Sequence, residues 1–337
     1  MTISGLGPHG ERAVPADKVV LSDEDAARAR SGRFRIAVVL HTTASDWAKQ
    51  ELAGIAATLS AYGASVVDII DCGFDRQTQN RELLRLSGES INAVISIPVG
   101  GSSVAEGHRA IARAGKTLVL LDNAPAGLLP GLDYAAVVSA DNFGLGVIAA
   151  ELLSPHIPDE GVAGILTYDA DFYATNEREI AFRKWIGLRR PDVTLVRGRF
   201  ATVDAAGAAF EELLTANDDL DGLFVAWDVP ALRVLEAIRA GSRRLAVTTV
   251  DLGNAVAAEL VSGEILKGIA AQRPYAQGCA AAIVALRSLI GAHSPPWIAT
   301  PGLCVTRDNV AEAYQAVWHA AAPQALLDAQ ASAHGDV

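Results

Sequence analysis

The sequence has no excess of basic residues and no apolar run of membrane-spanning length. Its 337 residues carry 39 acidic against 28 basic side chains, which gives a formal charge of −11. Binding to nucleic-acid phosphates needs clustered Lys and Arg, but the pairs Arg189-Arg190 and Arg243-Arg244 stand isolated. A membrane helix needs about 20 apolar residues in a row. These absences argue against a nucleic-acid partner and against a helical membrane protein.

Cysteine and catalytic motifs are also scarce. Cys72, Cys279 and Cys304 lie far apart and form no Cys-x-x-Cys pair, so we expect buried, unpaired thiols, and the redox compartment stays open. The seven histidines are scattered without the spacing of metal ligands, and the sequence has neither an HExxH motif nor a GxSxG elbow. We therefore expect no metal, no cofactor and no catalytic residues.

Two glycine-rich segments have only a superficial likeness to nucleotide-binding motifs. The stretch Gly100–His108 lacks the glycine spacing and the Lys-Ser/Thr pair of a phosphate loop. Gly144-x-Gly146-x-x-Ala149 follows a predicted strand and opens a helix, but no strand-end acid follows at the expected distance. We interpret the first as a strand-to-helix turn and the second as a close helix contact.

The N-terminal segment has no basic stretch followed by an apolar core, so it is not a secretory signal peptide. Either such a signal was removed or the protein has none. Residues 1–33 contain Gly, Pro and charges, and Asp23-Glu24-Asp25 precede an Ala/Arg run that predicts a short helix. The segment is too short for a DNA-binding headpiece of two or more helices.

What the sequence does contain is a regular alternation of short apolar runs with amphipathic stretches, which predicts parallel α/β structure buried on both faces. Gly63, Gly115 and Gly241 follow helix ends, as capping glycines do. The predicted strands are Arg35–Leu40, Ser65–Ile70, Ala93–Ile97, Thr117–Leu121, Ala135–Ser139, Val162–Thr167, Thr194–Arg199, Gly222–Ala226, Leu245–Val250 and Leu303–Thr306. The predicted helices are Trp47–Tyr62, Gln77–Leu86, Ala105–Ala114, Asn176–Leu188, Ala205–Thr215, Pro230–Ala240, Tyr275–Leu289 and Asp308–Ala321, and we expect the tail after Pro323 to fray.

Two predicted strands end in a tryptophan beside an aspartate. Asp46-Trp47 follows the first strand, and Trp227-Asp228 follows the strand that ends at Ala226. Ligands of open α/β sheets bind outside the carboxyl ends of the strands. An indole face together with carboxylate acceptors suits a polyhydroxylated small molecule. The alternative is ordinary packing for the tryptophans and N-capping for the aspartates.

Further polar residues stand at other strand ends, and they make a shared cleft more probable than isolated caps. They are Asp122 and Asn123, Asp251, Tyr173 and Asn176 beyond the strand 162–167, and Gln272 at the end of the second α/β block.

At these residues the chain resembles the type I periplasmic sugar-binding proteins of ABC transporters, the group typified by ribose-binding protein. The likeness runs from about residue 33 to 318 and includes the blocks Val137–Gly144 and Ile269–Pro274. It implies a monomeric, extracytoplasmic binding protein that delivers a sugar to permease subunits. It also implies two doubly wound parallel-sheet domains joined by a three-crossing hinge and closing on the ligand. The expected divisions are an extension at 1–33, a first domain of 34–140 plus 273–302, a second of 141–272 plus 303–323, and a tail at 324–337.

The resemblance assigns roles residue by residue. Trp47 looks like the aromatic residue that stacks on the sugar, and Asp122 like the acid that accepts hydroxyl hydrogen bonds. Asp228 and Asp251 match polar positions of the second domain, and Gln272 matches a hinge-side glutamine.

The chain also departs from the ribose-type pattern. Asn123 stands where an arginine is expected, and Asn176 replaces a second arginine, while Arg178 aligns with a neighbouring structural position. Trp227 is bulkier than ribose requires. These departures favour another pentose or a short linear polyol over ribose.

Three other interpretations remain open at this stage. They are the effector domain of a transcriptional regulator, a receptor-coupled sensor, and a cytoplasmic α/β enzyme acting on a sugar or nucleotide. The missing headpiece counts against the first, and the missing catalytic residues count against the enzyme.

We expect Trp47→Ala and Asp122→Ala each to weaken ligand binding by about 2 kcal/mol, because each removes a contact or leaves a ligand hydroxyl without its partner. Titration calorimetry with a bound sugar or polyol measures the change. Near wild-type affinity in both variants would contradict the site assignment.

Overall fold

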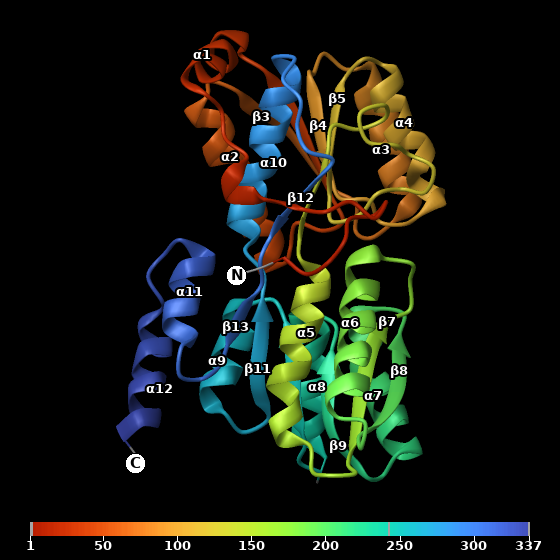
Figure 1. Cartoon of the computed structure of the whole chain (residues 1–337), viewed down its shortest axis with the longest axis vertical. Coiled ribbons are helices and arrows are strands. Elements are labelled where there is room, and N and C mark those ends of the chain that lie inside the picture. Colours follow the sequence, from red (N-terminus) through yellow and green to blue (C-terminus); the bar gives the residue numbers. More distant parts are fainter. Residues whose placement is uncertain (1–2, 242, 336–337) are drawn as a thin grey trace. The chain divides into compact units, whose positions relative to one another are not determined.

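The computed structural model describes residues 3–241 and 243–335, which form two compact units (Figure 1). Unit 1 comprises the chain up to Asp141 together with Asp171–Ala174 and Pro274–Pro301. Unit 2 comprises Asn142–Ala170, Thr175–Arg273 and the chain from Gly302 onward. The predicted α/β class with doubly wound, mostly parallel sheets is confirmed.

Unit 1 is built on a parallel sheet, seven-stranded within the described residues, with the order β1-β12-β6-β5-β4-β2-β3. Its strands are β1 (Val14–Pro15), β2 (Arg35–Leu40), β3 (Ser65–Asp71), β4 (Ala93–Ser96), β5 (Thr117–Leu121), β6 (Val137–Ala140) and β12 (Trp297–Thr300). Its helices are α1 (Asp23–Gly32), α2 (Asp46–Ala61), α3 (Arg76–Gly88), α4 (Ala105–Arg113) and α10 (Pro274–Leu289).

Helices cover both faces of this sheet because its strands alternate two apolar faces. In β2, Ile36, Val38 and Leu40 belong to the core shared with α2 and α10, whereas Ala37 and Val39 belong to the core shared with α3 and α4. Figure 1 shows α2 and α10 side by side.

Glycines bring α2 and α10 into close contact. A Cβ on Gly54 would lie 2.1 Å from the carbonyl oxygen of Tyr275, and a Cβ on Gly278 would lie 2.2 Å from that of Glu51. Only glycine fits at these two crossing points. The contact holds Glu51 against α10.

Unit 2 has a sheet of six strands among the described residues, in the order β13-β11-β10-β9-β7-β8, with β13 alone antiparallel to its neighbour. The strands are β7 (Val162–Tyr168), β8 (Thr194–Phe200), β9 (Leu220–Val225), β10 (Ala246–Val250), β11 (Leu266–Ala271) and β13 (Leu303–Val305). The helices are α5 (Asn142–Leu153), α6 (Tyr173–Arg189), α7 (Ala206–Ala216), α8 (Asp228–Ala240), α9 (Asn254–Ser262), α11 (Val310–Trp318) and α12 (Gln324–Gly335).

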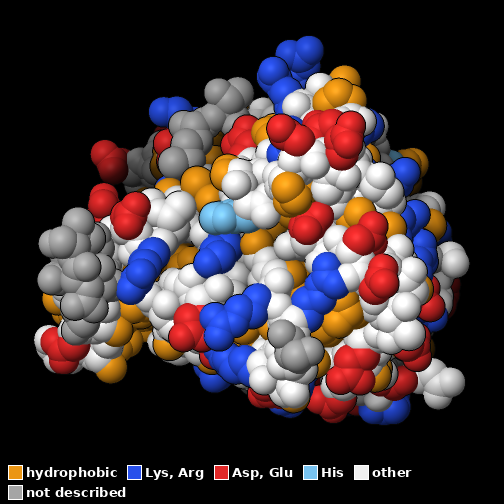
Figure 2. All heavy atoms as spheres, turned by 90° about the horizontal axis from the view of Figure 1, so that it is seen from below, with side chains coloured by type: hydrophobic (Ala, Val, Ile, Leu, Met, Phe, Trp, Pro, Cys, Tyr) orange, Lys and Arg blue, Asp and Glu red, His pale blue; other side chains and the backbone are white. Residues whose placement is uncertain are grey.

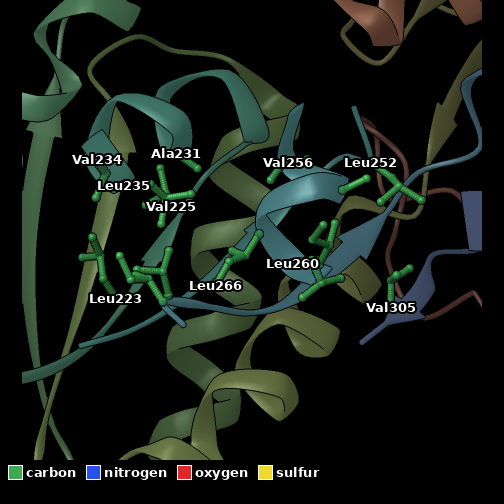
Figure 3. Close-up of a cluster of buried hydrophobic side chains, with 14 of the residues drawn as sticks. Leu223, Val225, Ala231, Val234, Leu235, Leu252, Val256, Leu260, Leu266 and Val305 are labelled. Atoms are coloured by element: carbon green, nitrogen blue, oxygen red, sulfur yellow. The ribbon is translucent and has the colours of Figure 1, made fainter. Parts of the chain in front are cut away.

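One large apolar core joins the sheet of unit 2 to α7, α8, α9 and α11 (Figure 3). Leu223 and Val225 of β9 meet Val234 and Leu235 of α8 there. At the contact of α5 with α6, a Cβ on Gly146 would lie 2.2 Å from the carbonyl oxygen of Arg178. This confirms the close helix contact predicted for the Gly144-x-Gly146 motif.

Two predictions about local structure need correction. Residues 324–335 were expected to fray but form α12, because Leu326 is buried in the core of unit 2. The N-cap of α2 is Ser45 and not Asp46, since the Ser45 side chain accepts from the Ala48 N–H. The three glycines expected at helix ends are found there: Gly63 and Gly115 have the left-handed backbone, and Gly241 is the C-cap residue of α8, with its N–H donating to the Ala237 carbonyl.

The apolar pattern also missed β11, β12 and α9. The strand β12 is four residues long and fully buried, so it shows no alternation that could separate it from a loop.

At the N-terminus, the predicted short helix is α1, capped by Ser22, and the unexpected β1 pairs with β12. The turn predicted within Gly100–His108 is confirmed, since α4 starts at Ala105.

No helix among the described residues is long and apolar enough to cross a membrane. On the face drawn in Figure 2, acidic and basic side chains are interspersed, and neither sign forms one continuous patch.

The three cysteines, all within the described residues, are unpaired. Cys72 is buried as expected, whereas Cys279 is half-buried and Cys304 is exposed.

His108 gives unit 1 a pH-dependent stability. It is fully buried on α4, with Nε2 3.1 Å from Ser96 Oγ and Nδ1 2.7 Å from the Val104 carbonyl oxygen. Burial lowers the pKa of His108 to about 4, against a smaller opposing effect of its bond to Val104. The imidazole is therefore neutral in the folded protein and takes up a proton more readily when unfolded.

The folded pKa of His108 lies below the ordinary value of about 6.5. Neutral His108 therefore makes its full contribution to the free energy of unfolding at pH 7, and this contribution is lost as the pH falls toward 4. We expect the contribution of His108 to the free energy of unfolding to fall by about 2 kcal/mol when the pH is lowered from 7 to 5. Urea unfolding of wild type and His108→Asn at both pH values measures it. The exposed-site variant His293→Asn is the control, and an unchanged pH dependence in His108→Asn would refute the assignment.

Candidate functional site

The aspartates that follow β5 and β10 share one unusual backbone conformation. Asp122 has φ 53° and Asp251 has φ 74°, and both residues are buried. Each donates its backbone N–H to the next strand of its sheet, Asp122 to Val138 at 3.1 Å and Asp251 to Ala270 at 3.2 Å. A left-handed residue other than glycine costs about 1–3 kcal/mol and is concentrated at functional sites. Each unit thus maintains a strained, buried carboxyl group at the carboxyl end of its sheet.

Each of these carboxyl groups accepts a hydrogen bond from a glutamine. Gln277 of α10 donates from Nε2 to Asp122 Oδ1 at 3.1 Å, and Gln272, just after β11, donates from Nε2 to Asp251 Oδ1 at 2.6 Å. Both glutamines are buried. Gln272 belongs to the predicted site residues, whereas Gln277 does not. The same pair of residue types therefore recurs in both units.

Trp47 of unit 1 lies in an aromatic group at the start of α2. His41, one residue after β2, packs edge-on against Trp47 at 5.5 Å and against Phe74 at 4.9 Å between ring centroids. Phe172 lies 6.5 Å from the same imidazole. The Trp47 side chain is partly buried against the core. The ring is oriented by its neighbours, as a stacking platform needs.

The electrostatics keep His41 neutral. Burial lowers the pKa of His41 to about 4, and the nearby Asp71 carboxylate opposes this only in part. Burial raises the pKa of Asp71 itself, but the N–H and hydroxyl of Thr43, the N–H of Gly73 and the His41 ring outweigh burial, so the net shift is downward. The aromatic group therefore presents an uncharged surface at neutral pH.

Asn123 and Glu51 are among the side chains of unit 1 that have buried atoms without hydrogen-bond partners in the described part of the chain. Asn123 donates from Nδ2 to the Pro98 carbonyl oxygen at 2.9 Å, while its Oδ1 has no partner. Glu51 of α2 is fully buried, and neither of its carboxyl oxygens has a partner. Burial raises the pKa of Glu51 well above its usual range, and the Asp122 carboxylate raises it further. Sequence reasoning missed Glu51.

Tyr173 starts α6 but belongs to unit 1. Its hydroxyl donates to the backbone carbonyl of Leu6. In the same stretch, the N–H groups of Ser4 and Gly5 donate to the Asp141 carboxylate at 2.7 and 2.9 Å. The N-terminal segment thus contacts one of the predicted ligand residues, which the sequence did not indicate.

In unit 2, Asp251 has a buried basic neighbour. Arg178 of α6 donates from Nε to Asn142 Oδ1 at 2.9 Å and from Nη1 to the Ala226 carbonyl oxygen at 3.0 Å. Burial raises the pKa of Asp251, and the Arg178 charge and the Gln272 hydrogen bond act against this shift. Arg178 holds the carboxyl end of β9, in keeping with the structural position predicted for it.

The other predicted residues of unit 2 follow β9 or begin α6. Trp227 is the N-cap residue of α8. Its ring packs edge-on against Tyr168, at 5.5 Å between ring centroids, and at a tilt against Phe200, at 5.2 Å. Asp228 is buried as the first residue of α8. Asn176 is half-buried in the first turn of α6.

The structure therefore divides the predicted residues between the two units. Unit 1 holds Trp47, Asp122, Asn123 and Tyr173, and unit 2 holds Asn176, Trp227, Asp228, Asp251 and Gln272.

Two buried residues that the sequence analysis did not predict, Glu51 and Gln277, nevertheless have a recognisable signal in the sequence. Glu51 is a charge one helical turn after Trp47, on a helix face that is otherwise apolar, and Gln277 directly precedes the glycine that packs against α2.

Comparison with known proteins identifies a family. Residues 36–293 match the family model described as a periplasmic binding protein domain. No curated protein sequence matches the chain.

Solved structures share the fold at low sequence identity. An ABC transporter solute-binding protein from Mycobacterium smegmatis with bound glycerol is 23% identical, with a TM-score of 0.76 over 83% of this chain and 96% of that one. One from Agrobacterium vitis bound with α-D-tagatopyranose is 22% identical, with a TM-score of 0.77 over 86% and 100%. A carbohydrate transporter solute-binding protein from Agrobacterium radiobacter in complex with D-arabinose is 20% identical, with a TM-score of 0.75 over 85% and 99%.

We expect Arg178→Met to lower the free energy of unfolding by about 3 kcal/mol, because breaking a buried charge network leaves its partners without compensation. Here Asp251 loses the attraction of the guanidinium, and the Ala226 carbonyl loses its donor. Arg183→Met, at a half-exposed position on the same helix, is the control. Urea unfolding followed by tryptophan fluorescence measures both, and equal losses in the two variants would contradict a special role of Arg178.

Proposed function

Because the chain belongs to the periplasmic binding protein family, we propose that it captures a sugar or a short polyol and delivers it to the permease of an ABC importer. Members of this family are extracytoplasmic solute-binding proteins of transport and not enzymes. For this chain we propose the same: reversible binding outside the cytoplasm without turnover, by a monomer that docks on permease subunits.

The observation that carries the proposal is the repeated pair of a strained, buried aspartate with a glutamine. A carboxylate accepts hydroxyl hydrogen bonds that are shorter and about twice as strong as those between neutral groups. The glutamine amide holds each carboxylate in place. Such positioned acceptors suit a molecule with many hydroxyl groups, and strained backbone positions of this kind cluster at ligand-binding sites.

The aromatic residues support the same ligand class. The indole face of Trp47 would cover the C–H surface of a sugar or polyol, while the acids Asp122, Asp228 and Asp251 would take its hydroxyls. Asn123, Tyr173, Asn176, Trp227 and Gln272 complete the proposed set. The similar structures carry glycerol, α-D-tagatopyranose and D-arabinose, which are all polyhydroxylated but differ in size.

The proposed mechanism is a shift of a conformational equilibrium. A ligand that contacts the residue sets of both units favours the conformation in which both sets reach it, by the difference in its affinity for the two states. A permease then distinguishes the loaded protein from the empty one. No bond of the ligand is formed or broken.

We expect at least one member of a panel of pentoses, hexoses and linear polyols to raise the melting temperature, because a ligand stabilises the form that it binds. The departures at Asn123 and Asn176 lead us to expect a shift with a pentose or short polyol that exceeds the shift with ribose. Thermal-shift measurements on the full chain test this.

Asp251→Asn is expected to lose most of the shift, whereas Asp204→Asn, at an exposed position, is expected to keep it. A panel without any shift would speak against sugar or polyol capture. A shift that is largest with ribose would leave capture standing and refute the assigned ligand preference.

A further inference from the structure

Glu51 is held where a carboxyl group has no structural use. It lies on α2 one helical turn after Trp47, and its backbone carbonyl touches Gly278 of α10. Helical side chains point back toward the helix N-terminus, so the carboxyl group of Glu51 is directed toward the end of α2 that carries Trp47. It is fully buried, and neither oxygen has a hydrogen-bond partner among the described residues. Burying an unpartnered polar group costs about 1–3 kcal/mol.

With Glu51 ionised, the unpartnered atoms of Glu51, Asn123 and Gln277 are all acceptors. Gln277 uses its amide donor group on Asp122 Oδ1 and on the Val138 carbonyl oxygen, at 3.1 and 3.2 Å, and its Oε1 is left buried without a partner. Asn123 Oδ1 and both carboxyl oxygens of Glu51 are also buried without a hydrogen-bond partner among the described residues. A hydroxyl group brings one donor and two acceptor lone pairs, whereas an ammonium group brings three donors and no acceptor. The inventory of unpartnered atoms therefore matches an ammonium better than a hydroxyl.

The negative charge of Glu51 and Asp122 also favours a ligand group with a positive charge. Glu51 has no ion-pair partner among the described residues, and after burial the charge of Asp122 is the second cause that raises its pKa. Burial raises the pKa of the Cys279 thiol on α10, a hydrogen bond with Thr58 opposes this shift, and the charge of Glu51 adds to it. A buried carboxyl beside another carboxyl is stabilised in its charged form by a nearby cation. In unit 2, Arg178 provides such a charge for Asp251, and a cationic ligand group would do so for Glu51.

We propose that Glu51 contacts the ligand and, together with Asp122 and Gln277, selects a sugar or polyol that carries an amino group. The inference rests on the proposed capture of polyhydroxylated ligands and names the subclass. Glu51 and Asp122 accept from the ammonium, Gln277 Oε1 accepts its remaining N–H, and Trp47 covers the adjoining carbon chain.

Matched pairs of ligands test the proposal: glycerol with 2-amino-1,3-propanediol, D-glucitol with 1-amino-1-deoxy-D-glucitol, and D-galactose with D-galactosamine. Titration calorimetry on the full chain at pH 7 gives the affinity ratio within each pair. We expect the amino member to bind at least about 10-fold more tightly in at least one pair, as charge-assisted bonds in a buried site allow. Glu51→Gln keeps the shape of the side chain and is expected to reduce this ratio to about 2-fold or less.

Glu106→Gln, at an exposed position on α4 of the same unit, is the matched control and is expected to keep the ratio of wild type. Tight binding of hydroxyl members with weaker or equal binding of their amino partners would overturn the inference and leave the proposed function intact. If neither member of any pair binds, the proposed function itself fails for this panel. An unchanged ratio in Glu51→Gln would remove Glu51 from the site, and if that variant does not fold, the wild-type ratios decide.

Discussion

Two buried aspartates in a left-handed backbone conformation are the constraint on which the candidate site depends. Asp122 and Asp251 occupy the turn after a central strand of each sheet, and each is tied by its N–H to the neighbouring strand. Strain at these turns is tolerated because the parallel strands and the helices on both faces leave the backbone no alternative path. The glutamines Gln277 and Gln272 then fix the carboxyl groups.

Close helix contacts supply the other positions. Gly54 and Gly278 let α2 approach α10, which sets Glu51 against the helix that carries Gln277. Gly146 lets α5 approach the Arg178 carbonyl on α6. The two helix contacts place residues of opposite charge near the buried aspartates. Unit 2 has a buried arginine near Asp251, whereas unit 1 has a second buried acid, Glu51, near Asp122. The charge around the two aspartates therefore differs, although both have the same left-handed backbone conformation.

Much of the fold was predictable from the order of apolar runs. The strands Arg35–Leu40 and Thr117–Leu121 match β2 and β5 residue for residue, because alternating or fully buried β-branched runs between helix signals leave few other options. Short buried strands such as β12 and the helix α12 were missed, since what stabilises them is contact with residues distant in the sequence. The cap of α2 was assigned one residue late because Ser45 and Asp46 are both good N-cap residues.

The sequence by itself determined the α/β class, the positions of most strands and the polar residues at their carboxyl ends, because these follow from local periodicity and from the chemistry of single side chains. Asp122, Asp251, Gln272 and Trp47 were found in this way. Only the tertiary structure decided that Asp122 is held by Gln277, that Asp251 has Arg178 as its neighbour, and that Glu51 is buried without a partner. Hydrogen bonding, burial and charge compensation depend on residues far apart in the chain, and no local pattern encodes them.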